Sequence, residues 1–144
     1  MDETSRLKFE ADLKNLARIR AFVERAATSS GADQEAVSDM VLAMNEAVTN
    51  IIIHGYRGQP GMIEIEVYYE GTTLVVRLRD WAAEFNPLSF PEPDIDLPLE
   101  KRPFGKMGIH LIRHFTDRLS YRITSDGSNE FSLIQQNARK LIGD

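Results

Sequence analysis

The stretch "MNEAVTNIIIHGY", residues 44–56, places a carboxylate and an amide one helical turn apart, at Glu46 and Asn50. Residues four apart on a helix lie along the same line of its surface. Many of their neighbours are alanine, valine and isoleucine. A carboxylate in such surroundings is costly to desolvate unless it is paired, binds a metal or takes part in catalysis. The pair therefore indicates a functional site, and the alternative is that both side chains point into water.

The second candidate is Asp80, the last residue of the stretch "TLVVRLRD". Side chains alternate between the two faces of a strand, so Val76 and Leu78 on the buried face predict the same face for Asp80. A carboxylate held there is a fixed acceptor at the rim of a pocket, whereas an aspartate that turns outward only starts a loop. The small residues of "WAAEFNP" leave room for a flat ligand against the backbone, and Phe85 is expected to return to the core.

The third candidate is the stretch "FGKMGIH", in which Gly105 and Gly108 flank the predicted start of a helix. Glycines there let the backbone approach an anion, and a helix start supplies unpaired N–H groups and a positive dipole. Lys106 can add a charge towards a phosphate or can simply be solvated. Because glycines also occur at loop ends for steric reasons, this pattern indicates phosphate binding only in combination with the other candidates.

The elements that must position these residues follow from hydrophobic periodicity. Helices are predicted over 12–31, 33–56 and 108–119. Strands are predicted near 6–11, over 119–123 and 130–134, and as a hairpin over 62–80 that turns at Gly71. Five of the six prolines lie in 87–103, which predicts a long loop. This order predicts one α+β domain over residues 1–144, with helices on one face of a mixed, mostly antiparallel sheet.

The second predicted helix is apolar on more than one side. One arc, expected to face the sheet, is formed by Val37, Met40, Val41, Met44, Val48, Ile51 and Ile52. Glu46 and Asn50 lie on the opposite side, together with Leu42, Ala43, Ala47 and Ile53. A helix of this kind is normally covered on both sides by protein or by a ligand.

Composition excludes several classes of function. The formal charge of the 144-residue chain is −5, and no run of Lys and Arg exceeds two, which argues against nucleic-acid and anionic-membrane surfaces. The absence of cysteine excludes disulfides, thiolate metal sites and cysteine nucleophiles. No apolar run approaches the roughly 18 residues of a membrane span, and the first residues lack a signal-peptide core. A cytoplasmic protein with no membrane or nucleic-acid partner is expected.

In combination and in this order, these features resemble the GHKL ATP-binding fold of gyrase-type ATPases and histidine kinases, specifically its anti-sigma-factor serine kinase branch. The match runs from Leu7 to about Ile134. "NEAVTNIIIHGY" resembles the N box, and "RDWAAEFNPL" stands where the family has D-x-G-x-x-F-x-P. "RPFGKMGIHLIRHFTDRLSY" resembles the closing G-x-x-G motif, followed by Asp and Tyr. The resemblance implies a Bergerat-type two-layer α/β sandwich that binds ATP and Mg²⁺.

The resemblance also implies a role for each motif residue. Glu46 is the expected catalytic base, and Asn50 is the expected Mg²⁺ ligand, about 6 Å away on the same helix face. Asp80 is expected to accept a hydrogen bond from the adenine amino group. Asp117, Tyr121 and Asn129 match positions that orient helix and strand. The other expected nucleotide contacts are Ala82, Phe85, Gly105, Lys106, Met107, Gly108 and Ser132, with the 87–104 loop as a lid.

The function implied by the resemblance is that of an ATP-dependent serine/threonine kinase in a bacterial partner-switching module. Its expected partners are an anti-sigma-factor antagonist, which accepts the phosphate, and a sigma factor, and it is expected to form a homodimer. The alternative is a nucleotide-gated binding module that sequesters a regulator with little or no kinase activity. Ala82 in place of the family's glycine and Ile53 in place of a common basic residue favour this alternative, whereas Glu46 favours the kinase. A detached histidine-kinase domain is disfavoured, because no histidine lies in a long dimerisation helix.

Overall fold

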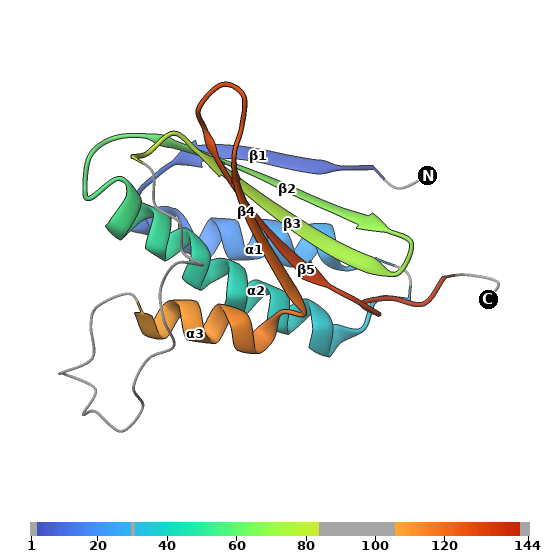
Figure 1. Cartoon of the computed structure of the whole chain (residues 1–144). Helices are drawn as coiled ribbons and strands as arrows, with labels where there is room; N and C mark the ends of the chain where they lie inside the picture. Colours follow the sequence, from blue (N-terminus) through green and yellow to red (C-terminus); the bar gives the residue numbers. More distant parts are fainter. Residues whose placement is uncertain (1–2, 30, 84–105, 142–144) are drawn as a thin grey trace.

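The computed structural model describes residues 3–29, 31–83 and 106–141, and it describes side chains throughout these ranges except at 106–110 (Figure 1). The element order matches the order predicted from the sequence. The elements are β1 (Ser5–Glu10), the 3-10 turn η1 (Leu13–Asn15), α1 (Leu16–Ala27), α2 (Gln34–Asn50), the π-helical turn η2 (Ile51–Gly55), β2 (Met62–Glu70), β3 (Thr73–Asp80), α3 (Lys106–Phe115), β4 (Arg118–Ile123) and β5 (Asn129–Gln135).

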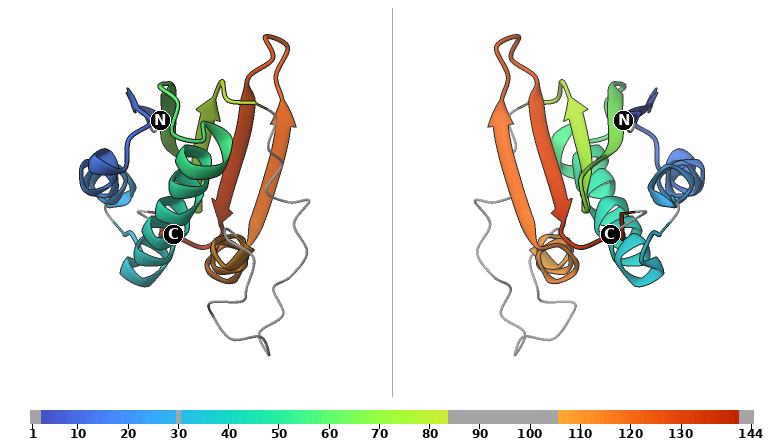
Figure 2. Two further views of the ribbon diagram at one scale, coloured as in Figure 1. Left: turned by 90° about the vertical axis from the view of Figure 1, so that its left-hand side faces the viewer. Right: turned by 90° about the vertical axis from the view of Figure 1, so that its right-hand side faces the viewer.

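The five strands form a single sheet in the order β1-β2-β3-β5-β4. All of the neighbouring pairs among these described strands are antiparallel. The helices α1, α2 and α3 lie against one face of this sheet (Figures 1 and 2). The predicted α+β two-layer sandwich is therefore confirmed, although the described sheet is wholly antiparallel rather than mixed.

The core lies between the sheet and the helices because the strands alternate apolar and polar side chains. In β2 and β3 the residues that face the helices are fully or almost fully buried, namely Ile63, Ile65, Val67, Leu74, Val76 and Leu78. The opposite face of the same strands carries charged residues such as Glu64, Arg77 and Arg79. Each deeply buried aliphatic side chain contributes about 1.5–3 kcal/mol to folding.

Helix α2 is the central helix of the layer. Its sheet-facing residues are buried as predicted, except for Val41, which is only partly buried. Ala43 and Ala47 on its other side are also buried, and α3 packs against α2. Leu42, by contrast, is 51% exposed. The prediction that α2 is covered on more than one side is thus confirmed for part of its length.

The helix formed by α2 and η2 is apolar enough to be compared with a membrane span. Gln34–Gly55 has 22 residues, and an 18-residue window within it has a mean hydropathy of 1.3, so by length and composition it qualifies as a candidate membrane span. In the structure, however, 56% of its apolar window is buried inside the protein. A core helix passes the same test of length and hydropathy, and its place against the sheet accounts for its composition.

The ends of the helices differ from the predicted ones. Beyond Asn50 the chain continues as a π turn, in which the Tyr56 N–H donates to the Ile51 carbonyl oxygen at 2.9 Å. α3 starts at Lys106, two residues before the predicted start, and ends at Phe115, four residues before the predicted end. It ends there because the following chain pairs with β5 instead of continuing the helix. The Asp117 N–H donates to the Ile134 carbonyl oxygen at 3.0 Å, and the Asp117 carboxylate accepts from the Gln136 N–H at 2.7 Å.

Candidate functional site

Asp80 is buried at the end of β3, with 6% of its surface exposed. Its Oδ1 accepts hydrogen bonds from the Ala82 N–H at 3.0 Å and from the Asn129 Nδ2 at 2.9 Å. Within the described ranges no hydrogen bond ends on its Oδ2. Burial raises the pKa of Asp80, although the hydrogen bonds from Asn129 and Ala82 oppose that shift. The predicted inward orientation is confirmed, and the second carboxylate oxygen has no hydrogen-bond donor among the described residues.

Asn129, at the start of β5, holds Asp80 in place. Its Oδ1 accepts from the Tyr121 hydroxyl at 2.6 Å, and its Nδ2 donates to Asp80 and also to the Ala82 carbonyl oxygen at 3.2 Å. An amide that is bonded at both ends cannot turn without losing bonds on both sides. The direction of the Asp80 carboxylate is therefore set by a chain of side chains from β4 through β5 to β3.

The end of the helix formed by α2 and η2 touches the segment that follows Asp80. A Cβ built on Gly55 would lie 3.3 Å from the Ala82 Cβ, so a side chain at position 55 would require that segment to shift. The Tyr56 hydroxyl donates to the Met62 carbonyl oxygen at 2.5 Å and accepts from the Trp81 N–H at 3.0 Å. We call these two hydrogen bonds the Tyr56 joint. The sequence alone assigns no role to Tyr56, although an aromatic residue with a polar tip beside a helix end is a signal for such a joint.

Ala82 stands where the resemblance implies glycine. Among the described residues, only Arg57 and Asn137 combine a side chain with a positive φ, so the backbone at Ala82 does not require glycine. The Ala82 methyl group lies beside Gly55 at the helix end. The structure therefore accommodates this departure from the family pattern without backbone strain.

Glu46 and Asn50 differ in burial. Glu46 is partly buried, and no hydrogen bond or ion pair from any residue in the described part of the chain ends on its carboxylate. The expectation of a carboxylate on a helix that is apolar nearly all round is met only in part, because Glu46 is partly exposed. A partly exposed carboxylate with no protein partner can accept a proton or a hydrogen bond from an incoming group.

Asn50 is 6% exposed, and its buried Nδ2 has no hydrogen-bond partner among the described residues. Leaving a buried amide atom unpaired costs about 1–3 kcal/mol. Native structures seldom do so unless a ligand, an ion or a water completes the site. The amide oxygen of the same side chain is a ligand of the kind that Mg²⁺ prefers. The residue therefore fits the predicted metal contact.

A protein-only metal cage is not found in the described part of the chain, where no group of three or more His, Cys, Asp or Glu residues is placed to bind a metal. This agrees with the chemistry of Mg²⁺ at phosphate sites, where one or two protein ligands act together with the phosphates. Two predicted contacts, Phe85 and Gly105, lie outside the described residues, as does the 87–104 loop. Gly108 is the third residue of α3 rather than its first, and the side chains of Lys106 and Met107 are not described.

Ser132 lies on the face of the sheet opposite to Asp80. It is paired in register with Arg77, whose Nε donates to its Oγ at 3.4 Å, whereas Asp80 is paired with Asn129. Residues three apart on a strand face opposite sides, so Ser132 points away when Asn129 points towards Asp80. The predicted contact between Ser132 and the nucleotide is therefore not retained.

The raised pKa of Asp80 predicts a pH-dependent stability. Burial raises this pKa above its ordinary value of 3.8, so the native state binds the proton more tightly than the unfolded chain does. The free energy of unfolding should therefore fall as the pH rises from 3.8 through the raised pKa, and this contribution should be constant above it. Urea unfolding at a series of pH values measures it as the difference between wild type and Asp80→Asn. A difference that does not change across that window would contradict the prediction.

Comparison with known proteins agrees with this geometry. The family model described as "Histidine kinase-like ATPase domain" matches residues 9–134. The chain is 26% identical over 151 residues to a protein named Anti-sigma F factor from Clostridium acetobutylicum, covering 100% of this chain and 99% of that protein. It is 31% identical over 119 residues to a protein named Serine-protein kinase RsbW from Bacillus cereus, covering 80% of this chain and 74% of that protein.

A solved structure shares the fold. It is the crystal structure of the RsbU and RsbW domains of Rv1364c from Mycobacterium tuberculosis, with a TM-score of 0.61 and 15% identity. The likeness covers 96% of this chain but only 34% of that one, so this chain spans about a third of its length. At this identity the likeness concerns the fold alone. Since the family model spans most of the sequence, including Glu46, Asn50 and Asp80, the chain belongs to the histidine kinase-like ATPase domain family.

Proposed function

We propose that this protein binds ATP with Mg²⁺ and transfers the γ-phosphate to a serine or threonine hydroxyl of an anti-sigma-factor antagonist. The observation that carries the proposal is that the motif residues leave hydrogen-bonding capacity unused in the described structure. Asp80 keeps one oxygen open, the Asn50 amide is buried with its Nδ2 unpaired, and Glu46 has no partner among the described residues. The relatives named as an anti-sigma factor and a serine-protein kinase support the same activity.

Recognition of the base is assigned to Asp80. Its open oxygen accepts a hydrogen bond from the adenine amino group, while Oδ1 remains bonded to Ala82 and Asn129. A carboxylate is an acceptor only, so a base that presents an oxygen at this point meets repulsion. The open oxygen of Asp80 therefore favours adenine, which presents an amino group, over guanine, which presents an oxygen at the same position.

Phosphoryl transfer is assigned to the residues of α2. Mg²⁺, when bound, neutralises charge on the phosphates and orients them for transfer. The Asn50 amide oxygen would hold it from the protein side. One turn earlier, Glu46 accepts the proton of the attacking hydroxyl as the oxygen of that hydroxyl forms its bond to the γ-phosphorus, and the bond from this phosphorus to the β,γ-bridging oxygen breaks, so that ADP leaves. Little further covalent help from the protein is needed, because positioning and charge account for most of the rate in such reactions.

The partners are proposed by kinship. The antagonist accepts phosphate, a sigma factor binds directly, and the protein acts as a homodimer in the cytoplasm, with residues 1–144 as one ATPase domain. Lys106, Met107 and Gly108 are proposed to contact the phosphates from the start of α3, together with Gly105. Phe85 is proposed to contact the nucleotide from the segment that follows Asp80.

A second candidate is the nucleotide-gated binding module with little kinase activity. The half-buried Ile53 favours it, because many relatives place a basic residue there that can contact phosphate. Incubation of the protein with Mg-ATP and a cognate antagonist separates the two functions. Transfer of phosphate supports the kinase, whereas tight ATP binding without transfer to the correct antagonist supports the binding module.

Asn50→Ala is expected to remove most of the effect of Mg²⁺ on ATP binding. The oxygen that holds the ion from the protein side is lost, whereas Asp80 and its hydrogen bonds are untouched. Calorimetric titration with ATP, with and without Mg²⁺, should show a Mg²⁺-dependent gain of at least about 10-fold in wild type and less than about 2-fold in the variant. Asn45→Ala, on the same helix, is the matched control and should keep the full gain. An equal gain in Asn50→Ala and wild type would contradict the metal assignment.

A further inference from the structure

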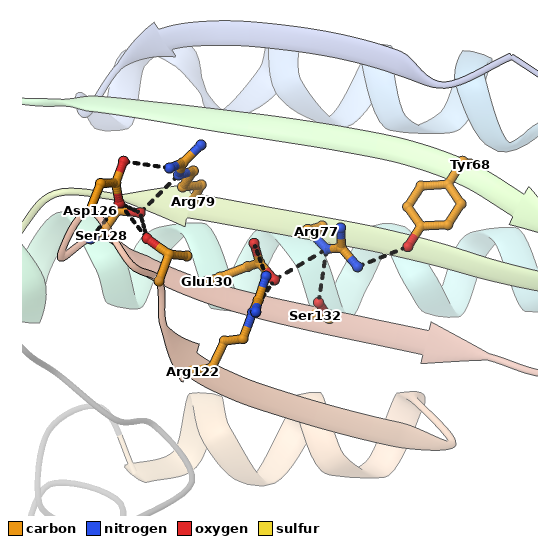
Figure 3. Close-up of polar contacts among 9 residues, drawn as sticks. Tyr68, Arg77, Arg79, Arg122, Asp126, Ser128, Glu130 and Ser132 are labelled. Carbon is orange, nitrogen blue, oxygen red and sulfur yellow. Dashed lines mark hydrogen bonds and ion pairs between the residues drawn. The ribbon is translucent and has the colours of Figure 1, made fainter.

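A second group of polar residues lies at the turn between β4 and β5, on the sheet face opposite the helices (Figure 3). The Asp126 Oδ1 accepts from the Ser128 N–H at 3.0 Å and from the Ser128 Oγ at 2.8 Å, and it also accepts from the Thr124 hydroxyl. Arg79 reaches this turn from β3. Its Nη2 donates to the Asp126 Oδ2 at 2.6 Å, and its Nε donates to the Ser128 Oγ at 2.8 Å. We call these four residues the turn cluster.

The turn cluster is ordered by charge as well as by geometry. The hydrogen bonds from Thr124 and Ser128, together with the charge of Arg79, hold the pKa of Asp126 well below its ordinary range. The Ser128 side chain is fully buried although the turn itself is at the surface. Arg79 binds with two nitrogens of its planar guanidinium, and such a fork fixes its partners more closely than a single point charge does.

The turn cluster lies back to back with the Asp80 site. Arg79 directly precedes Asp80 in β3, and Ser128 directly precedes Asn129 at the start of β5. Asp80 and Asn129 are partners in the register of the two strands. Because successive side chains face opposite sides of the sheet, the contact between Arg79 and Ser128 lies behind the contact between Asp80 and Asn129. The contact between Arg79 and Ser128 thus holds β3 and β5 together at the same point along the strands where Asn129 orients the Asp80 carboxylate.

Arg79 also supports the residue on the other side of Asp80. Its guanidinium lies over the Trp81 ring, with 5.5 Å to the ring centroid. Trp81 in turn donates its backbone N–H to the Tyr56 joint. Arg79 and Trp81, the two residues that flank Asp80 in the chain, are therefore both held in place: Arg79 by the rest of the turn cluster, and Trp81 by Arg79 and Tyr56.

We propose that Arg79 is a positioning residue for the base-binding site. With Asp126 and Ser128 it holds the first residue of β5 against the end of β3, so that Asn129 keeps the open oxygen of Asp80 directed at the nucleotide base. This inference rests on the proposed function for the identity of the ligand, but the effect on Asn129 can be measured without any ligand.

Arg77 provides a matched control. It lies two residues earlier in β3, on the same face, and its side chain has the same exposure as that of Arg79, 34%. It also makes several polar contacts, with the Tyr68 hydroxyl at 3.0 Å, the Ser132 Oγ at 3.4 Å and Glu130 at 3.6 Å (Figure 3). The contacts with Tyr68 and Ser132 lie in the middle of the strands, whereas Glu130 is the register partner of Arg79, next to the pair of Asp80 and Asn129. Arg77→Gln therefore removes a similar network on the same face while leaving the bonds of Arg79 to Asp126 and Ser128 in place.

The first experiment uses the nucleotide-free protein. Proton exchange of the Asn129 side-chain amide, followed by NMR, should be at least about 5-fold faster in Arg79→Gln than in wild type, because exchange occurs only while the hydrogen bonds are open and loss of Arg79 raises that open population. In Arg77→Gln the rate should stay within about 2-fold of wild type. Equal rates in wild type and Arg79→Gln, or equal acceleration in both variants, would overturn the positioning role.

The second experiment compares two ligands by calorimetric titration. Arg79→Gln should bind ATP about 10-fold more weakly than wild type, while its affinity for inorganic tripolyphosphate, which has no base, should stay within about 2-fold. Arg77→Gln should keep both affinities. Asp126→Asn attacks the same cluster from the exposed turn and should repeat the ATP-specific loss, which covers the case in which Arg79→Gln fails to fold. An equal loss for ATP and tripolyphosphate would overturn the inference.

The outcomes separate the inference from the proposed function. Wild-type protein that binds no ATP would contradict the proposed function, and the amide exchange of Asn129 would still decide the role of Arg79. If a folded Arg79→Gln variant bound ATP as tightly as wild type does, the positioning role would be overturned and the proposed function would stand.

Discussion

Asp80→Asn is expected to weaken ATP binding by at least about 100-fold while leaving the fold intact. Both hydrogen bonds that Asp80 accepts from the described residues end on Oδ1, and an asparagine oxygen at that place can keep them. The change then falls on the other atom, where an acceptor becomes an N–H donor. That donor faces the adenine amino group, which is also a donor. The size of the effect has two sources. One hydrogen bond to the base is lost, and two N–H donors are left facing each other without an acceptor.

Calorimetry with ATP measures this change, and circular dichroism with thermal unfolding verifies the fold. The melting temperature of Asp80→Asn should equal or exceed that of wild type near neutral pH, because a neutral amide is cheaper to bury than a carboxylate. Glu130→Gln is the matched control. It makes the same acid-to-amide change one residue beyond Asn129, on the outer face, and should leave ATP affinity within about 2-fold. Undiminished ATP affinity in Asp80→Asn would remove base recognition from this residue.

Glu46→Gln is expected to lower phosphate transfer to the antagonist by at least about 100-fold, with ATP affinity within about 3-fold of wild type. General base catalysis contributes about 10²–10⁴ to a rate, and glutamine has nearly the same shape but cannot accept the proton. The fold should be unaffected, since no residue in the described ranges hydrogen-bonds or ion-pairs with Glu46. A single-turnover assay with radiolabelled ATP, at saturating ATP and antagonist, separates this chemical step from binding.

Glu35→Gln is the control for this variant, because it makes the same change on the same helix in its first turn, far along the chain from the motif. It should transfer phosphate at the wild-type rate. If Glu46→Gln also transferred phosphate at that rate, the role of catalytic base would belong to another group. If it lost ATP binding to the same extent as transfer, Glu46 would be a binding residue rather than a base.

The parts of the fold that depend on local periodicity could be predicted from the sequence. The inward orientation of Asp80 follows from the alternation of Val76 and Leu78, and it is confirmed. The same rule could have excluded Ser132, but only once the register between β3 and β5 is known, because that register decides which β5 residues face Asp80. A resemblance to a motif indicates which residue types occur, but it does not by itself indicate which face of the sheet each side chain lies on.

Features that depend on contacts distant in sequence could not be predicted. Arg79 and Asp126 are separated by 47 positions, and nothing in the residues around either one identifies the other. The end of α3 at Phe115 is likewise set by the pairing of the next segment with β5, which overrides the helical pattern of the sequence. The unpaired Asn50 amide illustrates the opposite case. Its residue type marked it as a candidate, but only the structure shows that its buried Nδ2 has no hydrogen-bond partner among the described residues.

The Tyr56 joint has a mechanical consequence. One hydroxyl group bonds to the start of β2 and to the residue after β3, directly beyond the helix that carries Glu46 and Asn50. The segment after Asp80, which would read the base, is thereby hydrogen-bonded to the end of the helix whose residues would act on the phosphates. A movement of this helix end relative to the end of β3 would therefore have to break one of these two hydrogen bonds.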